Sequence, residues 1–346
     1  MLCALIMAGG IGKRFWPQST EKKPKQFLNL VGDKTMIQMT YDRVNRLIDK
    51  DKIFIITNEN YAKIVKKQLK GISDKNIIVE PSGRNTAPCI LLSCLYIKQI
   101  FGDVNIAVLP SDHIINNEDE FLKTISIAND YITDKGVNNI VTIGINPSRP
   151  ETGYGYIKTD GNKEIGKITN VEKFVEKPNF EKAVEYLRNG SYLWNAGMFI
   201  FNTKFMLTEL EKNCHETYEM LSELPSIDSK QYMDELKKVY PNCESISIDY
   251  AVMEKSKSIK VIPSDFGWDD VGTWQSLERY LNKDDNNNIC NGSNVEFWDS
   301  KNCVAYGLSK KIVLYDVNDL FVTEGQDVIV ITKKENMNEV CTLRKN

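Results

Sequence analysis

Histidine is scarce in this sequence. Only His113 and His215 occur among 346 residues. Enzymes that hydrolyse substrates by general acid–base catalysis usually employ a positioned base with a pKa near 7, most often histidine. The chain also lacks a G-x-S-x-G segment, the motif that presents the nucleophilic serine of α/β-hydrolases. A hydrolase of either kind is therefore disfavoured, and a reaction that depends on charge neutralisation is favoured.

Long apolar runs and paired cysteines are also missing. No stretch reaches the ~18 apolar residues of a membrane-spanning helix, so we expect no association with a membrane. The first ten residues, MLCALIMAGG, lack the basic segment of a signal peptide, and we expect a buried strand there. The eight cysteines are scattered without a C-x-x-C pair. This pattern disfavours zinc sites and disulfides and favours reduced thiols in a cytoplasm.

The charge balance is close to neutral. The net charge is −3, and both signs are spread along the chain. This distribution argues against general binding to nucleic acid. Any site for an anion must therefore be built locally from a few residues.

Short apolar runs alternate with longer amphipathic segments up to about residue 150. The apolar runs predict buried strands at 2–7, 53–57, 77–79, 106–109 and 140–143, and the segments between them predict helices at 36–49, 60–69, 87–101 and 118–133. This alternation favours a largely parallel sheet covered on both faces. Ligands of such sheets bind beyond the carboxyl ends of the strands.

The pattern changes after about residue 150. We expect paired strands near 153–158 and 173–177, a helix at 180–189, a strand at 198–201 and helices at 204–221 and 229–239. The polar, asparagine-rich segment 282–294 predicts a linker. Beyond it, runs of β-prone residues predict either a short β-solenoid or a small meander. We therefore expect a larger domain over 1–285 and a β domain over 286–346.

Residues 7–27, MAGGIGKRFWPQSTEKKPKQF, place glycines and cations directly after the first predicted strand. A dinucleotide-binding fingerprint needs a small residue where Phe15 stands. A Walker A loop needs Ser or Thr where Arg14 stands, and its first glycine would fall on Met7. Glycine amides can bind phosphate oxygens, and Arg and Lys supply the opposite charge. The stretch therefore predicts a site for a polyanion, with a tight turn and a solvated basic face as the alternative.

The same stretch resembles the signature loop of sugar-1-phosphate nucleotidyltransferases. Its form, GG-x-G-x-R-x-W-P followed by PKQF, is most similar to the mannose-1-phosphate guanylyltransferase branch, and later motifs follow in family order to about residue 280. The resemblance implies an α/β, Rossmann-like domain with a mixed, mostly parallel sheet and a small, β-helix-like C-terminal domain. It implies transfer of GMP from GTP to mannose 1-phosphate with Mg²⁺. The loop residues that it implies for nucleotide binding are Gly9, Gly10, Gly12, Lys13, Arg14 and Lys25.

Two carboxylates are candidate metal ligands. Asp112, preceded by Ser111, follows a predicted buried strand, where a carboxylate either holds a hard cation or serves as a turn or cap residue. Asp270 lies in GWDDVGTW, which resembles the family's second metal motif. The neighbouring Asp269 departs from that motif and either modulates the metal site or faces solvent. The resemblance implies that Asp112 and Asp270 hold Mg²⁺ and that Ser111 lies beside the nucleotide.

Residues 80–88, EPSGRNTAP, stand between a predicted strand and helix. A carboxylate can accept hydrogen bonds from guanine N1–H and N2–H₂, which adenine cannot supply together. A turn followed by Thr86 as helix cap is the structural alternative. The string also resembles the guanylyltransferase branch. The candidates for nucleotide binding here are Glu80, Gly83, Arg84 and Asn85.

The motifs that resemble the family's sugar site follow further along the chain. They are GYGY at 153–156, EKP at 176–178 and WNAGMF at 194–199. The resemblance implies that Lys177 binds the sugar phosphate and that Glu176 binds sugar hydroxyls, although surface strands also end in this way. The candidate sugar residues are Gly155, Glu176, Lys177, Asn195 and Gly197. Asp249 is interpreted as a helix cap first and a substrate contact second.

These features favour a transfer reaction without a protein base, because a phosphate nucleophile is already deprotonated. The residues implied to be catalytic are Arg14, Lys25, Asp112, Lys177 and Asp270. Three alternatives stay open: another sugar 1-phosphate or nucleotide, a non-catalytic regulatory homologue that binds sugar nucleotide, and a nicotinamide dehydrogenase, which Phe15 disfavours. An exposed strand edge in the β tail would make a homodimer plausible.

Overall fold

The computed structural model describes residues 1–10, 12–161, 163–292 and 294–343. The chain folds into two compact units. The larger contains residues 1–9 and 40–269, and the smaller contains residues 10–39 and 270–346. The predicted phosphate loop from Gly10 onward therefore belongs to the same unit as the C-terminal strands. The predicted division at residue 285 stays a prediction.

The larger unit is built on a nine-stranded sheet with the order β3-β2-β1-β4-β9-β6-β10-β8-β7. The pairs β3–β2, β2–β1, β1–β4 and β6–β10 are parallel, whereas β9 runs antiparallel to its neighbours β4 and β6. A second, two-stranded sheet pairs β5 with β11. The strands are β1 (Leu2–Met7), β2 (Ile53–Asn58), β3 (Ile77–Glu80), β4 (Asn105–Pro110), β5 (Ile114–Ile115), β6 (Ile140–Ile145), β7 (Tyr156–Thr159), β8 (Thr169–Val175), β9 (Tyr192–Asn202), β10 (Ile259–Ser264) and β11 (Trp268–Asp269).

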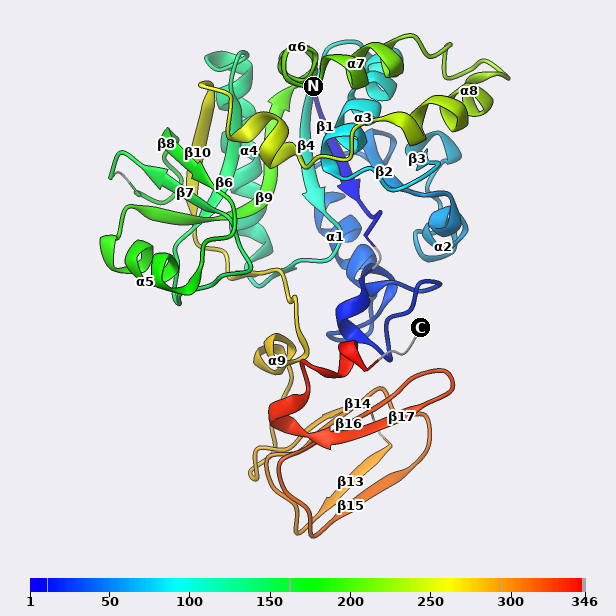
Figure 1. The fold of residues 1–346 in the computed structure, drawn as a ribbon, viewed down its shortest axis with the longest axis vertical. Coiled ribbons are helices and arrows are strands. Elements are labelled where there is room, and N and C mark those ends of the chain that lie inside the picture. The colour runs from blue at the N-terminus through cyan, green and yellow to red at the C-terminus, as the bar shows by residue number, and fades with distance from the viewer. Residues whose placement is uncertain (11, 162, 293, 344–346) are drawn as a thin grey trace. The chain divides into compact units, whose positions relative to one another are not determined.

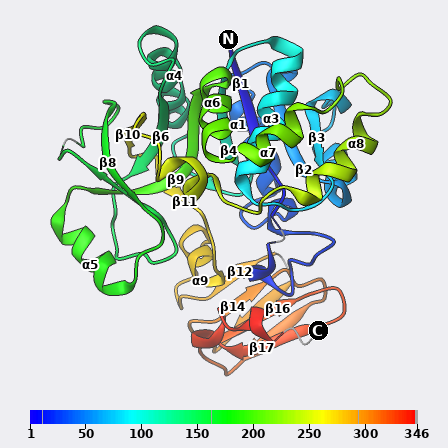
Figure 2. The same ribbon diagram turned by 45° about the horizontal axis from the view of Figure 1, so that its top comes forward.

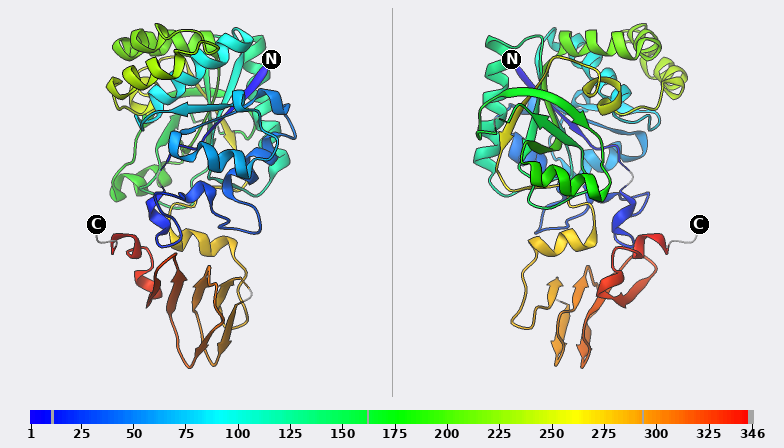
Figure 3. Two further views of the ribbon diagram at one scale, coloured as in Figure 1. Left: turned by 90° about the vertical axis from the view of Figure 1, so that its right-hand side faces the viewer. Right: turned by 60° about the vertical axis from the view of Figure 1, so that its left-hand side comes forward.

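Helices cover both faces of this sheet (Figure 3). On one face α3, α6 and α7 pack against one another (Figure 2), and alternate residues of β1, Cys3 and Leu5, join their apolar cluster. On the other face α4 packs against β4, β9 and β10. The helices are α1 (Met36–Val44), which spans the two units, α2 (Ala62–Gln68), α3 (Thr86–Phe101), α4 (Glu118–Asp134), α5 (Phe180–Asn189), α6 (Thr203–Asn213), α7 (His215–Ser222) and α8 (Tyr232–Val239), with the short turns η3 (Lys50–Lys52), η4 (Glu59–Tyr61), η5 (Asp74–Asn76), η6 (Tyr240–Asn242) and η7 (Asp249–Met253). No helix among the described residues is long and apolar enough to cross a membrane.

The predicted alternation of strands and helices is confirmed in this unit, although the predicted helix 204–221 is two helices, α6 and α7, and the predicted strand 198–201 begins at Tyr192. The strand at 2–7 and the helix at 180–189 have the predicted bounds. The predicted helix 36–49 stops at Val44. The predicted cap of α3, Thr86, is wrong, because the side chain of Asn85 accepts the hydrogen bond from the Thr86 amide. The Thr86 hydroxyl instead accepts from the amide of Ile248 at 2.8 Å.

The C-terminal strands of the smaller unit form two small sheets (Figure 1). In one, β12, β14 and β16 pair in parallel and β17 closes the edge antiparallel; in the other, β13 pairs in parallel with β15. The elements of this unit are η1 (Lys13–Phe15), η2 (Lys25–Phe27), α9 (Trp274–Leu277), η8 (Glu278–Tyr280), β12 (Ile289–Asn291), β13 (Val295–Trp298), β14 (Val304–Tyr306), β15 (Ile312–Tyr315), β16 (Leu320–Glu324), β17 (Ile329–Lys333), η9 (Lys334–Asn336) and η10 (Val340–Thr342).

The prediction of a linker at 282–294 is wrong for part of that segment. Residues 289–291 form β12, and Ile289 is fully buried. Asn288 is buried as well, and its side chain donates to the carbonyl oxygen of Ser300 and to the carboxylate of Asp284. The asparagines that suggested a flexible segment therefore satisfy backbone and side-chain partners in an ordered turn.

Candidate active site

Two predicted cations and one predicted carboxylate lie together in the smaller unit. Lys25 is only 6% exposed, and its ammonium donates a hydrogen bond to the carbonyl oxygen of Asp270. Gly12 has a φ of +55°, and a Cβ placed on it would lie 2.5 Å from the Lys25 amide nitrogen. Any larger residue at Gly12 would therefore both strain the backbone and displace Lys25.

Arg14 completes this group. A Cβ placed on Gly272 would lie 3.1 Å from Nη1 of Arg14 and 3.2 Å from Oδ2 of Asp270. The guanidinium and the carboxylate therefore both border the glycine. Between Asp270 and Gly272 lies Val271, a fully buried β-branched residue with a φ of +45°. Backbone strain of this kind persists where the surroundings hold it in place, and it is common at functional sites.

The space beside the other two glycines of the loop, Gly9 and Gly10, differs from that beside Gly12. In the part of the chain that the structure describes, no atom lies within 4 Å of a Cβ placed on Gly10. Gly9, which belongs to the larger unit, faces the Glu80 carboxylate, because an added Cβ would lie 3.1 Å from its Oε1. The side chain of Lys13 lies outside the described part of the structure. The loop is therefore open at Gly10 and closely packed at Gly12.

Glu80 ends β3 and is buried to 5% exposure. Its Oε2 accepts a hydrogen bond from the Tyr240 hydroxyl at 2.5 Å. Burial raises the pKa of this carboxyl to about 7, although hydrogen bonds from Tyr240 and Cys89 work in the opposite direction. A buried carboxylate with one oxygen held in place is suited to accept hydrogen bonds from a ligand with the other.

The rest of the 80–88 segment is anchored to η6. The Arg84 guanidinium donates to the carbonyl oxygen of Pro241. Asn85 adopts a φ of +65° and caps α3. Gly83 has open space where a side chain would be. The structure thus brings Glu80 and Gly9 together, and it gives Arg84 and Asn85 structural contacts beside their predicted role in binding.

Ser111 and Asp112 follow β4, as the sequence predicted. Ser111 is buried, and its amide donates to the carbonyl oxygen of Met7, the last residue of β1. Nδ1 of His113 accepts a hydrogen bond from the Trp268 indole at 3.0 Å, and the two rings meet edge to face. His113 is therefore bound to β11.

Asp269 does not face solvent. It is 4% exposed, pairs with Ile114 across β5 and β11, and lies 4.0 Å from the Arg149 guanidinium. Of the two roles considered for it, solvent exposure is wrong. The cation Arg149 compensates the buried carboxylate, which is the usual condition for burying such a group.

The predicted sugar residues gather on β8, β9 and the segment before β7. The backbone N–H of Asn195 donates a hydrogen bond to the carbonyl oxygen of Gly155 at 2.8 Å. A Cβ on Gly155 would lie 2.9 Å from Oε2 of Glu176, and Glu176 forms an ion pair with Lys177. The Asn195 side-chain oxygen accepts from the Gly197 amide at 3.0 Å. The structure therefore places all five predicted residues in one neighbourhood.

Asp249 joins this neighbourhood, and its interpretation as a helix cap is wrong. It is the first residue of η7, and the residue at the cap position is Ile248. Instead its Oδ1 accepts from the Asn195 side-chain nitrogen at 3.2 Å. Burial, with the nearby Glu176 carboxylate, raises the pKa of Asp249 to about 6. The secondary interpretation, a contact with substrate, stays a prediction.

Arg149 was missed at the level of sequence. Its guanidinium lies over the Trp194 ring, 5.0 Å from the centroid, and over Tyr154 at 5.9 Å. The side chain also pairs with Glu151 at 3.1 Å. Arg149 stands in the unremarkable string NPSRPETG, so no local signal reveals that distant aromatic residues surround it.

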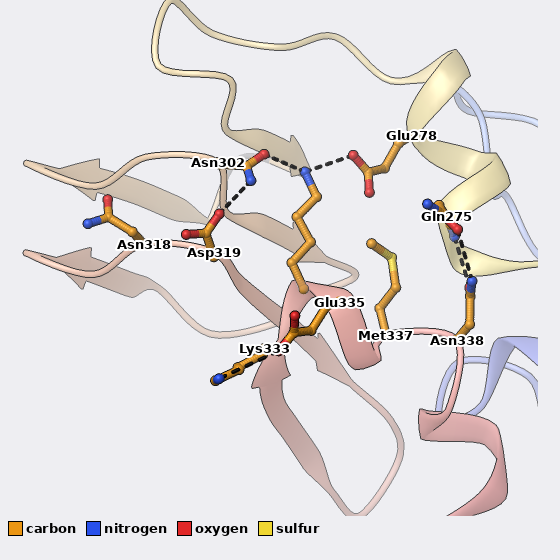
Figure 4. Close-up of a pocket in the computed structure, with 10 residues that line it drawn as sticks. Gln275, Glu278, Asn302, Asn318, Asp319, Lys333, Glu335, Met337 and Asn338 are labelled. Atoms are coloured by element: carbon orange, nitrogen blue, oxygen red, sulfur yellow. Dashed lines mark hydrogen bonds and ion pairs between the residues drawn. The ribbon is translucent and has the colours of Figure 1, made fainter.

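One cavity of about 460 Å³ lies in the smaller unit (Figure 4). Its lining is polar and comes from the segment after α9, the turns of the β sheets and the segment after β17. None of the predicted site residues lines it. The lining residues are Gln275, Glu278, Asn302, Asn318, Asp319, Lys333, Lys334, Glu335, Met337 and Asn338.

Comparison with known proteins decides the family. The nucleotidyl transferase family profile matches residues 3–287. The chain belongs to the nucleotidyl transferase family. Among similar proteins are mannose-1-phosphate guanylyltransferase 2 of Escherichia coli O157:H7 and the mannose-1-phosphate guanylyltransferase of Salmonella montevideo, each 38% identical over 98% of this chain and 72% of the relative. The alginate biosynthesis protein AlgA of Pseudomonas aeruginosa is 35% identical over 97% of this chain and 70% of its own length.

A solved structure agrees with this assignment. The crystal structure described as mannose-1-phosphate geranyltransferase from Thermus thermophilus superposes with a TM-score of 0.86 at 31% identity, over 99% of this chain and 98% of the other. The agreement confirms the predicted nucleotidyltransferase fold with a mixed sheet. It also confirms the family to which the sequence motifs pointed. The expectation that the sheet is mostly parallel is wrong, because β9 pairs antiparallel with β4, β6 and β7, and β8 pairs antiparallel with β7 and β10.

Proposed function

We propose that this nucleotidyl transferase moves GMP from GTP to mannose 1-phosphate, producing GDP-mannose and pyrophosphate. An oxygen of the sugar phosphate forms a bond to the α-phosphorus, and the bond from that phosphorus to the bridging oxygen breaks, so that pyrophosphate leaves with the electron pair. The grouping of Arg14 and Lys25 beside Asp270 is the observation that carries the reaction class. The names of the relatives that match across the chain support the choice of substrates.

The cations act on the phosphates in this proposal. Arg14 is exposed and able to reach a ligand, whereas Lys25 is held by the Asp270 carbonyl. Their charges neutralise the triphosphate and the leaving pyrophosphate, and fixed charges of this kind are effective because they need no reorganisation during the reaction. No histidine is needed as base, since the attacking phosphate oxygen is already ionised.

The larger unit binds the base and the sugar in this proposal. Glu80 accepts hydrogen bonds from guanine N1–H and N2–H₂, with Gly9, Gly83, Arg84, Asn85 and Ser111 around the nucleotide. Lys177 holds the sugar phosphate, and Glu176, Asn195 and Asp249 accept or donate hydrogen bonds to sugar hydroxyls. Gly155 and Gly197 keep the space beside these side chains clear.

The donor set fits a magnesium ion. The described residues contain no group of three or more His, Cys, Asp or Glu side chains that could hold a metal, but Mg²⁺ is usually bound through one or two carboxylates together with substrate phosphates and water. Asp112 and Asp270 would hold it. When bound, the ion would neutralise negative charge on the phosphate oxygens.

Pyrophosphate release tests the proposal. Purified protein with Mg²⁺ is supplied with GTP, ATP, UTP or dTTP and with mannose 1-phosphate or glucose 1-phosphate, and Asp112→Asn serves as control. We expect release with GTP and mannose 1-phosphate and its loss in the variant. Release with another pair would show that the base or the sugar has been misassigned. Binding of GTP without release for any pair would favour the regulatory homologue.

Four further expectations belong with this proposal. They are a homodimer, a cytoplasmic location, a division of the chain at residue 285 and a β-helix form of the C-terminal strands. The parallel pairing of β12, β14 and β16 supports the last of these. Size-exclusion chromatography with light scattering would measure the oligomeric state.

A further inference from the structure

The phosphate loop packs on aromatic residues that follow Asp270. Phe15, which is fully buried, meets Trp274 edge to face with ring centroids 5.1 Å apart. The Trp274 indole donates a hydrogen bond to the carbonyl oxygen of Trp16 at 3.2 Å. Arg14 stands directly before Phe15 in the chain. Its backbone position therefore depends on how Trp274 is held.

Trp274 is in turn held by the C-terminal strands. Its ring contacts Tyr306 of β14 and Phe321 of β16, each with centroids 5.0 Å away. The Tyr306 hydroxyl lies within hydrogen-bond distance of the carbonyl oxygens of Leu30, at 2.8 Å, and Asn29, at 3.1 Å. The residues that follow Arg14 and the residues that follow Lys25 therefore contact the same aromatic group.

Two glycines, Gly307 directly after β14 and Gly325 directly after β16, lie against the loop. A Cβ on Gly325 would lie 2.6 Å from the Pro17 Cβ and 2.9 Å from the Pro17 oxygen. A Cβ on Gly307 would overlap Nε2 of Gln18. That nitrogen donates to the carbonyl oxygen of Glu324 at 2.5 Å. A side chain at Gly325 would meet the Pro17 backbone, and a side chain at Gly307 would displace the Gln18 side chain from its hydrogen bond, so this surface fits the loop closely.

The residues that follow Trp274, up to Glu278, are also held by polar contacts. The Lys334 ammonium lies 2.8 Å from the Glu278 carboxylate and donates to the Asn302 side chain at 2.7 Å (Figure 4). Lys334 and Glu278 are each 14% exposed. The backbone N–H of Gln275 donates a hydrogen bond to the side-chain oxygen of Asn338 at 3.1 Å. These contacts join α9 and η8 to the β sheets and to the segment after β17.

We propose that the surface formed by Trp274, Tyr306, Phe321 and Gly325, which we call the seat, holds the backbone of the phosphate loop in place. Gln18, Trp274 and Tyr306 are then positioning residues for Arg14 and Lys25. The inference rests on the proposed function of those two cations. The seat acts by fixing the loop backbone, because a displacement of about 1 Å in a positioned group can cost ~10²-fold in rate. The β domain then contributes to turnover without touching substrate.

Small substitutions test the seat in the full-length enzyme. Tyr306→Phe removes one hydroxyl and keeps the ring that contacts Trp274, Gln18→Ala removes the hydrogen bond to Glu324, and Gly325→Ala introduces a methyl group against Pro17. The matched control is Tyr315→Phe, the same change at a 64% exposed position of the β domain. All variants are assayed at a temperature at which circular dichroism shows them folded.

We expect the Gln18→Ala, Tyr306→Phe double variant to lose at least ~10-fold in kcat, with the KM for mannose 1-phosphate unchanged. Hydrogen exchange at the amides of residues 14–30 should become faster in this variant and in Gly325→Ala, and both measurements should stay within about twofold in Tyr315→Phe.

Unchanged kcat with faster exchange would show that the seat exists without serving catalysis, and lower kcat with unchanged exchange would show that the residues act in another way. Either result overturns the inference. Arg14→Ala separates it from the proposed function. If that substitution leaves kcat/KM intact, the role of the cations fails; if it abolishes activity while the seat variants stay active, the seat alone fails.

Discussion

The two compact units carry different kinds of predicted site residue. The larger unit holds Glu80, Asp249 and Asn195 in hydrogen bonds to neighbours, and it also carries Lys177, the cation assigned to the sugar phosphate. The smaller unit supplies the cations Arg14 and Lys25, next to buried aromatic rings. Hydrogen-bonding side chains held in fixed directions can discriminate one base or sugar from another. A fixed positive charge, in contrast, stabilises the phosphate groups of any substrate. Recognition and charge neutralisation can therefore be separated by mutation.

The largest effect is expected from the cations. Lys25→Met retains the buried stem and removes the ammonium, and Arg14→Ala removes the guanidinium. Each should lower kcat/KM by ~10²–10⁴-fold, because each charge stabilises the transition state. Steady-state kinetics of pyrophosphate release measure the loss. Lys22→Met, at an exposed position of the same loop, is the control, and a loss below tenfold for either cation would contradict its assignment.

A smaller and more selective effect is expected at Asp249. Asp249→Asn keeps the size of the side chain and removes its charge beside Glu176. We expect kcat/KM for mannose 1-phosphate to fall by ~10–100-fold, since a lost hydrogen bond to a substrate hydroxyl leaves polar groups unpaired. The KM for GTP should be unchanged. Asp234→Asn, at an exposed position on α8, is the matched control; equal losses for both substrates would argue against a role in recognising the sugar.

Glu80 should affect how stability depends on pH. Its carboxyl has a pKa raised from 4.5 to about 7 in the folded protein, so between these values the folded state binds more protons than the unfolded state. The stabilisation is therefore complete below about pH 4.5 and is lost as the pH rises through about 7, and it amounts to roughly 3 kcal/mol at most.

Glu80→Gln should flatten this pH dependence of the free energy of unfolding. Urea unfolding at about pH 5 and about pH 8 gives the difference for each protein. Glu185→Gln, at an exposed position on α5, controls for the removal of one carboxyl. A slope that survives in Glu80→Gln would mean that another group titrates.

The smallest effect is expected at His215. This side chain is 63% exposed and pairs with Glu219 one turn along α7 at 3.2 Å. Exposed pairs of this kind contribute about 0–1 kcal/mol. His215→Ala should change neither kcat nor its pH profile beyond about twofold. A larger change in the kinetics would reopen the possibility of a histidine base.

The sequence predicted the parts of the site that lie close together in the chain. The glycines, Arg14 and Lys25 share one loop, and β1 was predictable because apolar residues fill its whole length. Asp249 was misjudged because an acidic residue at the start of a helix usually caps it, and only the fold brings Asn195 to its carboxylate. Arg149 was missed for the same reason, since its partner Trp194 stands tens of residues away.

The grouping of residues 10–39 with the C-terminal strands was not predictable either. It depends on contacts such as Gln18 with Glu324 and Tyr306 with Leu30, which span more than 270 residues. Neither partner carries a sequence signal for the other. Asn288 was misjudged in the opposite direction, because polar composition is shared by linkers and by turns in which a buried side chain is hydrogen-bonded, as that of Asn288 is.

The central claim is that different residues recognise the sugar and neutralise the phosphate charge. The most direct test is the ratio of kcat/KM for mannose 1-phosphate to kcat/KM for glucose 1-phosphate with GTP. This ratio is measured in the wild type, Lys25→Met and Asp249→Asn. Our account predicts that Lys25→Met lowers both values together and leaves the ratio within about twofold, whereas Asp249→Asn reduces the ratio by about tenfold or more. A changed ratio in Lys25→Met together with an unchanged ratio in Asp249→Asn would contradict it.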